Sequence, residues 1–303
     1  MRALLAACVA AWVLAAPAPA QAWGLEVHRL LTLRVIDGLP SQLKPFFAEQ
    51  RDFISEHSVD PDLWRVVDLR TEVGNENPNH FFNIDALDQP APFERVPRSW
   101  DALVEQYGRA RADRAGRLPY RIEALFERIV AMLREIARPA GSPYAAENAR
   151  YLVSVLSHYV QDAHQPLHVT ANYDGRGTGQ RGIHSRFETH LALSHWSEIR
   201  WSAVPARPVA DVREFIFGAI VRSHARVDQV LRADRRAAGG RELYDAAYYA
   251  VLFREARPAL EASLNEAVDA MASLVVTAWT QAGQPALPVS AGAGRPVPIR
   301  RTP

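Results

Sequence analysis

The spacing of the apolar residues constrains the fold most strongly. From residue 102 onward these residues recur every three or four positions, which is the spacing of amphipathic helices packed on a core. The pattern covers residues 122–136 and 151–159, and similar patterns occur at about 28–37, 209–232, 241–253 and 258–281. No run of alternating Val, Ile and Thr is long enough to build a sheet. We therefore predict one all-α domain of several helices, from Trp23 to about Gln281.

Two stretches interrupt the helical pattern, and a third follows it. Residues 66–97 carry several Asn, Asp and Pro residues, and residues 170–183 carry four glycines. Long loops in compact domains are usually functional or disordered. Residues 282–303 are rich in Pro, Gly, Ala and Arg, so we predict a disordered tail there.

The N-terminus has the layout of a secretory signal peptide. Arg2 precedes an apolar run from Ala3 to Ala16, which Ala20-Gln21-Ala22 follows as an A-x-A cleavage site. Two alternatives are a membrane anchor, for which the run is too short because a span takes about 20 residues, and a lipoprotein box at Cys8, which leaves little apolar sequence ahead of the cysteine. We predict cleavage after Ala22 and a secreted or periplasmic product.

Cleavage would leave a chain without thiols. The sequence holds one cysteine, Cys8, and ten histidines among 303 residues. Loss of residues 1–22 removes Cys8 and one charge, Arg2, so the net charge falls from +1 to zero. Disulfides and Cys-ligated metals are thereby excluded, and no strongly basic surface is indicated. Histidine is the metal ligand left to a chain without cysteine.

Histidines and carboxylates are densest between residues 157 and 188. His158 and Asp162 are four residues apart and so share one helix face. Pro166 should end that helix and let His168 turn back toward the same site. His184 and Glu188 repeat the four-residue spacing after the glycine-rich stretch. Any one such pair is more often a surface pair, but five of these residues within 31 positions favour a metal site, with zinc the leading ion.

The pattern His-x3-Asp-x-His-Gln-Pro-x-His followed by His-x3-Glu resembles the family that joins the zinc-dependent phospholipases C of bacteria with the single-strand-specific type I nucleases of fungi and plants. The resemblance extends to a mature N-terminus of Trp23-Gly24, to His28 five residues on, and to His80-Phe81-Phe82. It implies an all-α domain with three zinc ions in a cleft.

The resemblance also implies which residues bind each zinc ion. Trp23, through its α-amino group and carbonyl oxygen, and His28 would hold one zinc. Asp162 would bridge that ion to a second zinc, held by His80, His158 and an aspartate near position 62. The third zinc would lie between the side chains of His168, His184 and Glu188.

The aspartate near position 62 remains open between Asp62 and Asp60. In the nucleases of this family an arginine that contacts phosphate follows the aspartate after three residues. Asp62 with Arg65 fits this pattern, and Asp60 is the second choice. We therefore expect Asp62 and Arg65 to be catalytic. A zinc-activated hydroxide would attack phosphorus in line, and Arg65 would stabilise the developing charge.

Three further residues are candidates for contacting substrate. Phe81 stands where the nucleases place an aromatic side chain that stacks on a base, although a core role is equally compatible with the sequence. Asn83 stands where they commonly have an aspartate that binds the base. Tyr173, in the glycine-rich stretch, could line the cleft. His164 is assigned to packing or ligand support, and His57, His190, His195 and His224 to ordinary positions.

The sequence leaves three functions open. The first is a secreted nuclease that cuts single-stranded DNA and RNA. The second is a phospholipase C that acts on phosphatidylcholine-type lipids, because Glu188 and the short interval from His168 to His184 resemble the phospholipases. The third is an inactive zinc-binding protein. No obligate protein partner is indicated, and we expect a monomer.

Overall fold

The computed structural model describes residues 23–66, 75–202 and 205–289, and all regular structure in these ranges is helical. The all-α prediction is therefore confirmed for this part of the chain. The predicted signal peptide lies outside the described residues, as do residues 290–303 of the predicted tail. Among the described residues, no helix is both long and apolar enough to cross a membrane.

The chain forms helices of very different lengths. In chain order they are α2 (Gly24–Gly38), α3 (Lys44–Ala48), α4 (Arg51–His57), α5 (Asp60–Val66), η1 (Asn77–His80), η2 (Ile84–Leu87), α6 (Trp100–Tyr107), α7 (Arg109–Ala115), α8 (Leu118–Ala137), α9 (Ala145–Ala163), η3 (Pro166–His168), η4 (Arg176–Thr178), α10 (Ile183–Ser185), η5 (Arg186–Leu191), α11 (Ala192–Ser194), η6 (Trp196–Glu198), α12 (Val212–Ala225), α13 (Val227–Ala238) and α14 (Ala246–Gln281). Of these, η5 is a π-helical segment and the other η elements are 3₁₀ helices.

The helix α9 is at the centre of the fold. It packs against α8, α14, α4 and α2, and its residues from Val153 to Ala163 are all buried. A helix that is buried on all sides can hold polar side chains only where they have partners. His158 and Asp162 therefore require specific partners inside the protein.

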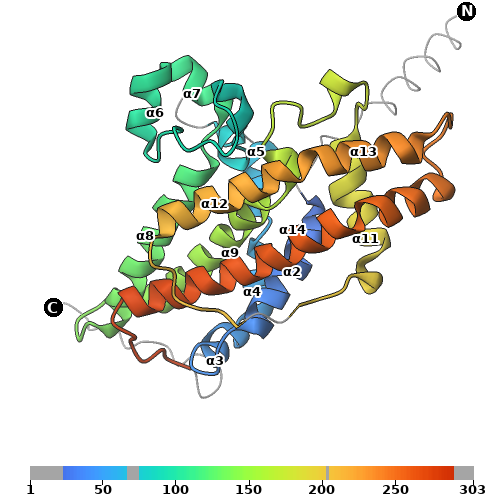
Figure 1. The fold of residues 1–303 in the computed structure, drawn as a ribbon. Helices are drawn as coiled ribbons and strands as arrows, with labels where there is room; N and C mark the ends of the chain where they lie inside the picture. The colour runs from blue at the N-terminus through green and yellow to red at the C-terminus, as the bar shows by residue number, and fades with distance from the viewer. Residues whose placement is uncertain (1–22, 67–74, 203–204, 290–303) are drawn as a thin grey trace, which may run out of the picture.

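The longest helix, α14, crosses the molecule with α13 packed along it (Figure 1). At 36 residues it would be about 54 Å long. The sequence pattern suggested separate helices at about 241–253 and 258–281, but one helix runs through Pro258. Pro258 has no N–H group to donate to the carbonyl of Arg254, four residues earlier. Both residues are exposed, so water can satisfy that carbonyl. Conversely, the single pattern at 209–232 is divided between α12 and α13 at Arg226.

The buried apolar side chains form two clusters. The larger contains the inner faces of α8, α9 and α12 and the C-terminal half of α14. The smaller contains Trp23, then Val27 and Leu31 of α2, with α13 and the N-terminal half of α14. Because α9 contributes to one cluster and the start of α2 to the other, His158 and His28 meet where the two clusters join.

Candidate metal centre

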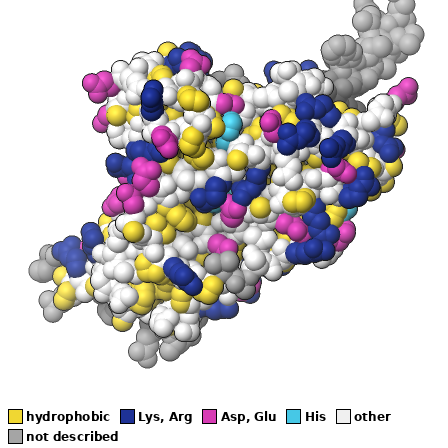
Figure 2. Space-filling model, in the orientation of Figure 1, with side chains coloured by type: hydrophobic (Ala, Val, Ile, Leu, Met, Phe, Trp, Pro, Cys, Tyr) yellow, Lys and Arg dark blue, Asp and Glu magenta, His cyan; other side chains and the backbone are white. Residues whose placement is uncertain are grey.

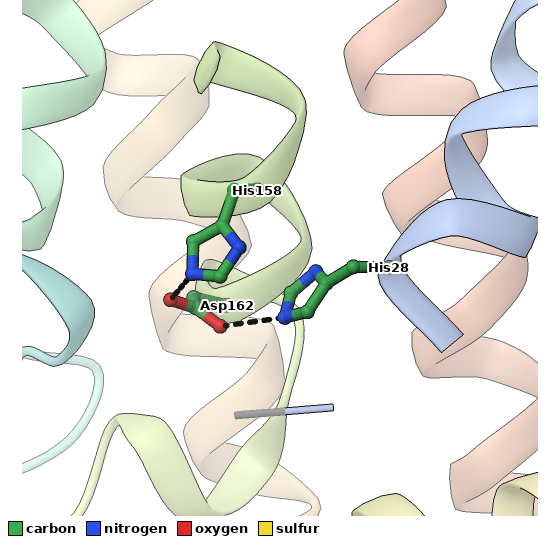
Figure 3. Close-up of side chains that lie close together, drawn as sticks. All are labelled: His28, His158 and Asp162. Atoms are coloured by element: carbon green, nitrogen blue, oxygen red, sulfur yellow. Dashed lines mark ion pairs between the residues drawn. The ribbon is translucent and has the colours of Figure 1, made fainter. Parts of the chain in front are cut away.

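Two histidines from different helices face one carboxylate at the centre of the protein. His28 comes from α2, and His158 and Asp162 come from α9; all three are fully buried. Asp162 lies between the two imidazoles (Figure 3), with Oδ1 3.7 Å from His28 Nε2 and Oδ2 3.3 Å from His158 Nε2. Their donor atoms lie close enough together to hold a metal ion. We call these three residues the first group.

A second group shares His158 and adds Asp62 and His80. His80 Nδ1 lies 3.0 Å from His158 Nε2 and 3.1 Å from Asp162 Oδ2. Asp62 Oδ1 lies 3.8 Å from His80 Nδ1 and 4.0 Å from His158 Nε2. Ligands of a tetrahedral zinc at about 2.0 Å are about 3.3 Å apart. The three donor atoms of the second group, 3.0–4.0 Å apart, lie close enough together to hold a single ion.

The structure distinguishes between the two candidate aspartates. Asp62 is 4% exposed and faces the second group, and Arg65 donates to its Oδ1 at 3.0 Å. Asp60 faces another way, with its Oδ2 bonded to His57 Nδ1 and Tyr151 Oη. Only Asp62 lies with the other predicted ligands.

The third group contains His168, His184 and Glu188. Glu188 Oε2 lies 3.0 Å from His184 Nε2 and 3.5 Å from His168 Nε2. The helix α9 ends at Ala163, ahead of Pro166, and His168 follows in η3, as the sequence pattern predicted. Gln165 Nε2 donates to Glu188 Oε2 at 2.8 Å, which links this carboxylate to the end of α9.

Hydrogen bonds to carbonyl oxygens orient four of the five histidines. The Nδ1–H group of His28 donates to Gln161 Oε1, and those of His158, His168 and His184 donate to the backbone oxygens of Ser58, His80 and Tyr173. Since a carbonyl can only accept, each neutral ring leaves the lone pair on Nε2, which faces its group. His80 instead turns Nδ1 toward its group.

Burial and charge shift the pKa values of these ligands in opposite directions. Burial and the neighbouring His158 lower the pKa of His28 to about 3, which keeps this imidazole neutral. Burial also opposes charge on His168, but the carboxylates of Asp162 and Glu188 outweigh it and raise the pKa of His168 to about 9. Burial likewise disfavours a charged Glu188, yet His184 and His168 lower its pKa to about 2.

Several buried polar atoms in these groups have no hydrogen-bond partner among the described residues. They include His28 Nε2, Asp162 Oδ1 and Glu188 Oε1. An unpaired buried acceptor costs about 1–3 kcal/mol, so such atoms need an explanation. A cation bound in the first group and another in the third would satisfy these three atoms. The donor set of imidazole nitrogens and carboxylate oxygens, without thiolate, suits a borderline divalent ion.

Trp23 lies beside Gln161, the residue that is hydrogen bonded to His28 of the first group. Trp23 is completely buried, and its indole Nε1 donates to Gln161 O at 2.9 Å. Gly24 has φ 49°, and a Cβ there would lie 2.9 Å from Thr189 Cγ2. The Trp-Gly pair is therefore suited to a tight entry into α2. In the full-length chain the nitrogen of Trp23 forms a peptide bond with Ala22, so the implied α-amino ligand would exist only after cleavage.

A cavity of about 330 Å³ opens over the second and third groups. Arg65, Phe81, Asn83 and Tyr173 all line it, together with ligands of both groups. This volume falls within the usual range for small-molecule sites. Phe81 is partly exposed, and a Cβ at Gly116 would lie 2.1 Å from its carbonyl oxygen, so only glycine fits behind it. The four residues predicted to contact substrate thus share one cavity.

The other histidines lie outside the three groups. His164 Nδ1 donates to Val160 O, and its ring faces an apolar space beside Phe215 and Leu274, which is a packing role. His57 and His195 are bonded to carboxylates on the following turn, His224 lies beside Asp85, and His190 packs against Tyr249.

Sequence reasoning missed two glutamines that orient ligands. Gln161 accepts from His28 and donates to Thr32 Oγ1 and Ser157 Oγ, so its amide orientation is fixed. Gln165 holds Glu188. The available signal was glutamine close to His158 and Asp162 in a stretch expected to be buried, because a buried amide must have partners.

No family model matches the chain, and no curated protein is significantly similar to it.

Proposed function

We propose that the protein is an exported zinc-dependent phosphodiesterase that hydrolyses single-stranded DNA and RNA, and that it is a member of the family whose motif it resembles. The observation that carries the proposal is a cavity over two of the three buried His and carboxylate groups, the second and the third, which Arg65 and the partly exposed Phe81 also line. An enzyme acting on a phosphodiester needs positive charge, an activated water and a place for the organic part of its substrate.

The three groups suit three zinc ions. Zinc bound there would act as a Lewis acid toward phosphate and would lower the pKa of water toward about 7. Six positive charges from three ions exceed the three negative charges of Asp62, Asp162 and Glu188, so the floor of the cavity would attract an anion. Basic and acidic side chains are interspersed over the face in Figure 2, and the bound metal would supply the local positive charge.

The residues of the chain have separable roles in this proposal. Arg65 reaches the cavity while donating to Asp62, so a second of its N–H groups can contact a phosphate oxygen. The ring of Phe81 offers a face for a nucleobase, and stacking contributes about 1–3 kcal/mol per base. Asn83 Nδ2 is near Arg114 O, at 3.4 Å, and Asn83 Oδ1 has no partner among the described residues. Because that oxygen is buried, the amide of Asn83 would have to turn before it could accept from a base.

A phospholipase C is the second candidate, because the third group uses Glu188 as the phospholipases do. The test gives purified mature protein heat-denatured DNA and, separately, phosphatidylcholine vesicles, each with and without chelator. We expect acid-soluble nucleotides from DNA, no phosphocholine, and no product with chelator. Phosphocholine without nucleotides would favour the second candidate, and no product from either substrate would indicate the inactive zinc-binding protein.

A further inference from the structure

Arg186 is a buried arginine that lies two residues from each of two ligands of the third group, His184 and Glu188. Its side chain is 7% exposed. A guanidinium is costly to bury unless it is paired and hydrogen bonded. The partners of Arg186 therefore indicate which parts of the fold it holds together.

The guanidinium connects three separate elements. Its Nε donates to Tyr248 Oη of α14 at 2.9 Å, and its Nη2 donates to Asp234 Oδ1 of α13 at 3.0 Å. It also reaches back to the glycine-rich stretch, where Nη1 donates to Arg181 O at 2.9 Å and Nη2 to Gln180 O at 3.3 Å. One side chain thus fixes the residues immediately before His184 to the pair of helices α13 and α14.

Asp234 completes this connection from the other side. It is 2% exposed, and it accepts hydrogen bonds from Tyr248 Oη and, at 2.6 Å, from Gln180 Nε2. Gln180 Nε2 also donates to Leu231 O at 2.8 Å. The end of the glycine-rich stretch is therefore held by both charged residues of a buried ion pair.

The third group has few restraints of its own. His184 follows Gly175, Gly179 and Gly182, which all have positive φ, and glycine loses the most conformational freedom on folding. The bond from His184 Nδ1 to Tyr173 O is 3.3 Å long, against 2.6–2.9 Å for the corresponding bonds of His28, His158 and His168. Among these four histidines, His184 thus has the longest and weakest orienting hydrogen bond.

We propose that Arg186, paired with Asp234, is a positioning residue that sets the affinity of the third group for its metal ion by holding the glycine-rich stretch against α13 and α14. The inference rests on the proposed function for the identity of the ion. It makes occupancy of one group depend on two helices that contribute no ligand to it.

The test is zinc retention by Arg186→Met at buffered free zinc, read by elemental analysis beside the thermal midpoint. The matched control is Arg150→Met. Arg150 is 4% exposed, donates to Phe46 O and Glu49 Oε2, and stacks on the ring of Phe46. It lies eight residues before His158, about 12 Å along α9. Both variants lose a buried arginine with similar partners, so both should unfold at lower temperature.

We expect wild-type protein and Arg150→Met to retain three zinc ions. Arg186→Met should retain two and bind the third about 10–100-fold more weakly, which is the range for lost ligand-supporting contacts. Arg186→Lys keeps the charge but cannot match the guanidinium geometry. It is the second variant, to be used if Arg186→Met does not fold, and it should weaken binding of the third zinc ion about tenfold. Wild-type affinity for the third zinc in folded Arg186→Met or Arg186→Lys would overturn this inference alone. Fewer than three zinc ions in the wild type would overturn the proposed function as well.

Discussion

The first and third groups place similar ligands on different kinds of backbone. In the first group, His158 and Asp162 lie one turn apart on α9, a 19-residue helix buried along most of its length, and His28 faces them from another regular helix. In the third group, His184 and Glu188 lie on a three-residue helix and a π-helical segment that follow a glycine-rich stretch. The regular helices fix their ligands by backbone geometry, whereas the irregular segment needs support from side chains outside it.

The largest effect is expected from Asp162, since it contacts ligands of all three groups. Its oxygens lie within 3.7 Å of nitrogens of His28, His80, His158 and His168. Asp162→Asn removes the negative charge and should cost at least two of three zinc ions and about 10³-fold or more in turnover of denatured DNA. Full zinc content measured in the variant would show that the charge of Asp162 does not hold the groups together.

An extension ahead of Trp23 should affect the first group alone. Two residues left before Trp23 keep its nitrogen in a peptide bond, so that nitrogen cannot serve as an α-amino ligand. We expect loss of one zinc ion and about a 100-fold fall in activity. The same two residues added after Pro303 serve as the control. Unchanged zinc content and activity would contradict a role for the α-amino group.

Glu188→Gln should affect the third group alone. Glu188 is fully buried, and its charge lies beside His168 and His184. Loss of that charge should release one zinc ion and lower activity about 10–100-fold, with the other two ions retained. Glu123→Gln, which removes a partly exposed carboxylate paired with Arg213, should retain all three. Release of all three zinc ions from Glu188→Gln would mean that the groups are not independent.

The same contrast explains what the sequence could predict. His158, Asp162 and the end of their helix before Pro166 follow from helical periodicity and proline stereochemistry, which are local. His28 and His80 were assigned through a resemblance. They lie about 130 and 80 positions before the α9 residues that they meet, and no local rule brings residues so far apart in the sequence together. The contacts of Arg186 with Asp234 and Tyr248 were not predictable, because partners so far along the chain are selected by tertiary packing. The sequence pattern wrongly indicated a break near Pro258 for the same reason. There α14 continues through the proline because it packs on both apolar clusters.

The smallest expected effect concerns stability without metal, in protein kept in chelator. The contributions of His28 in the first group and His168 in the third group to stability should change with pH in opposite directions. A pKa raised to about 9 means that His168 contributes stability that is fully present below its unfolded pKa of about 6.5 and is lost as the pH rises toward 9. A pKa lowered to about 3 means that His28 contributes stability present above about pH 6.5 and lost as the pH falls. Thermal midpoints from pH 5 to 9 should therefore show wild type losing its advantage over His168→Gln at high pH, and its advantage over His28→Gln at low pH. Each pH unit across such a titration is worth about 1.4 kcal/mol, and each kcal/mol moves the midpoint of a chain this size by about 2–4 °C, so each change should be several degrees. Differences that stay constant with pH would mean that neither imidazole changes its charge on folding, and the electrostatic contrast between the two groups would then be wrong.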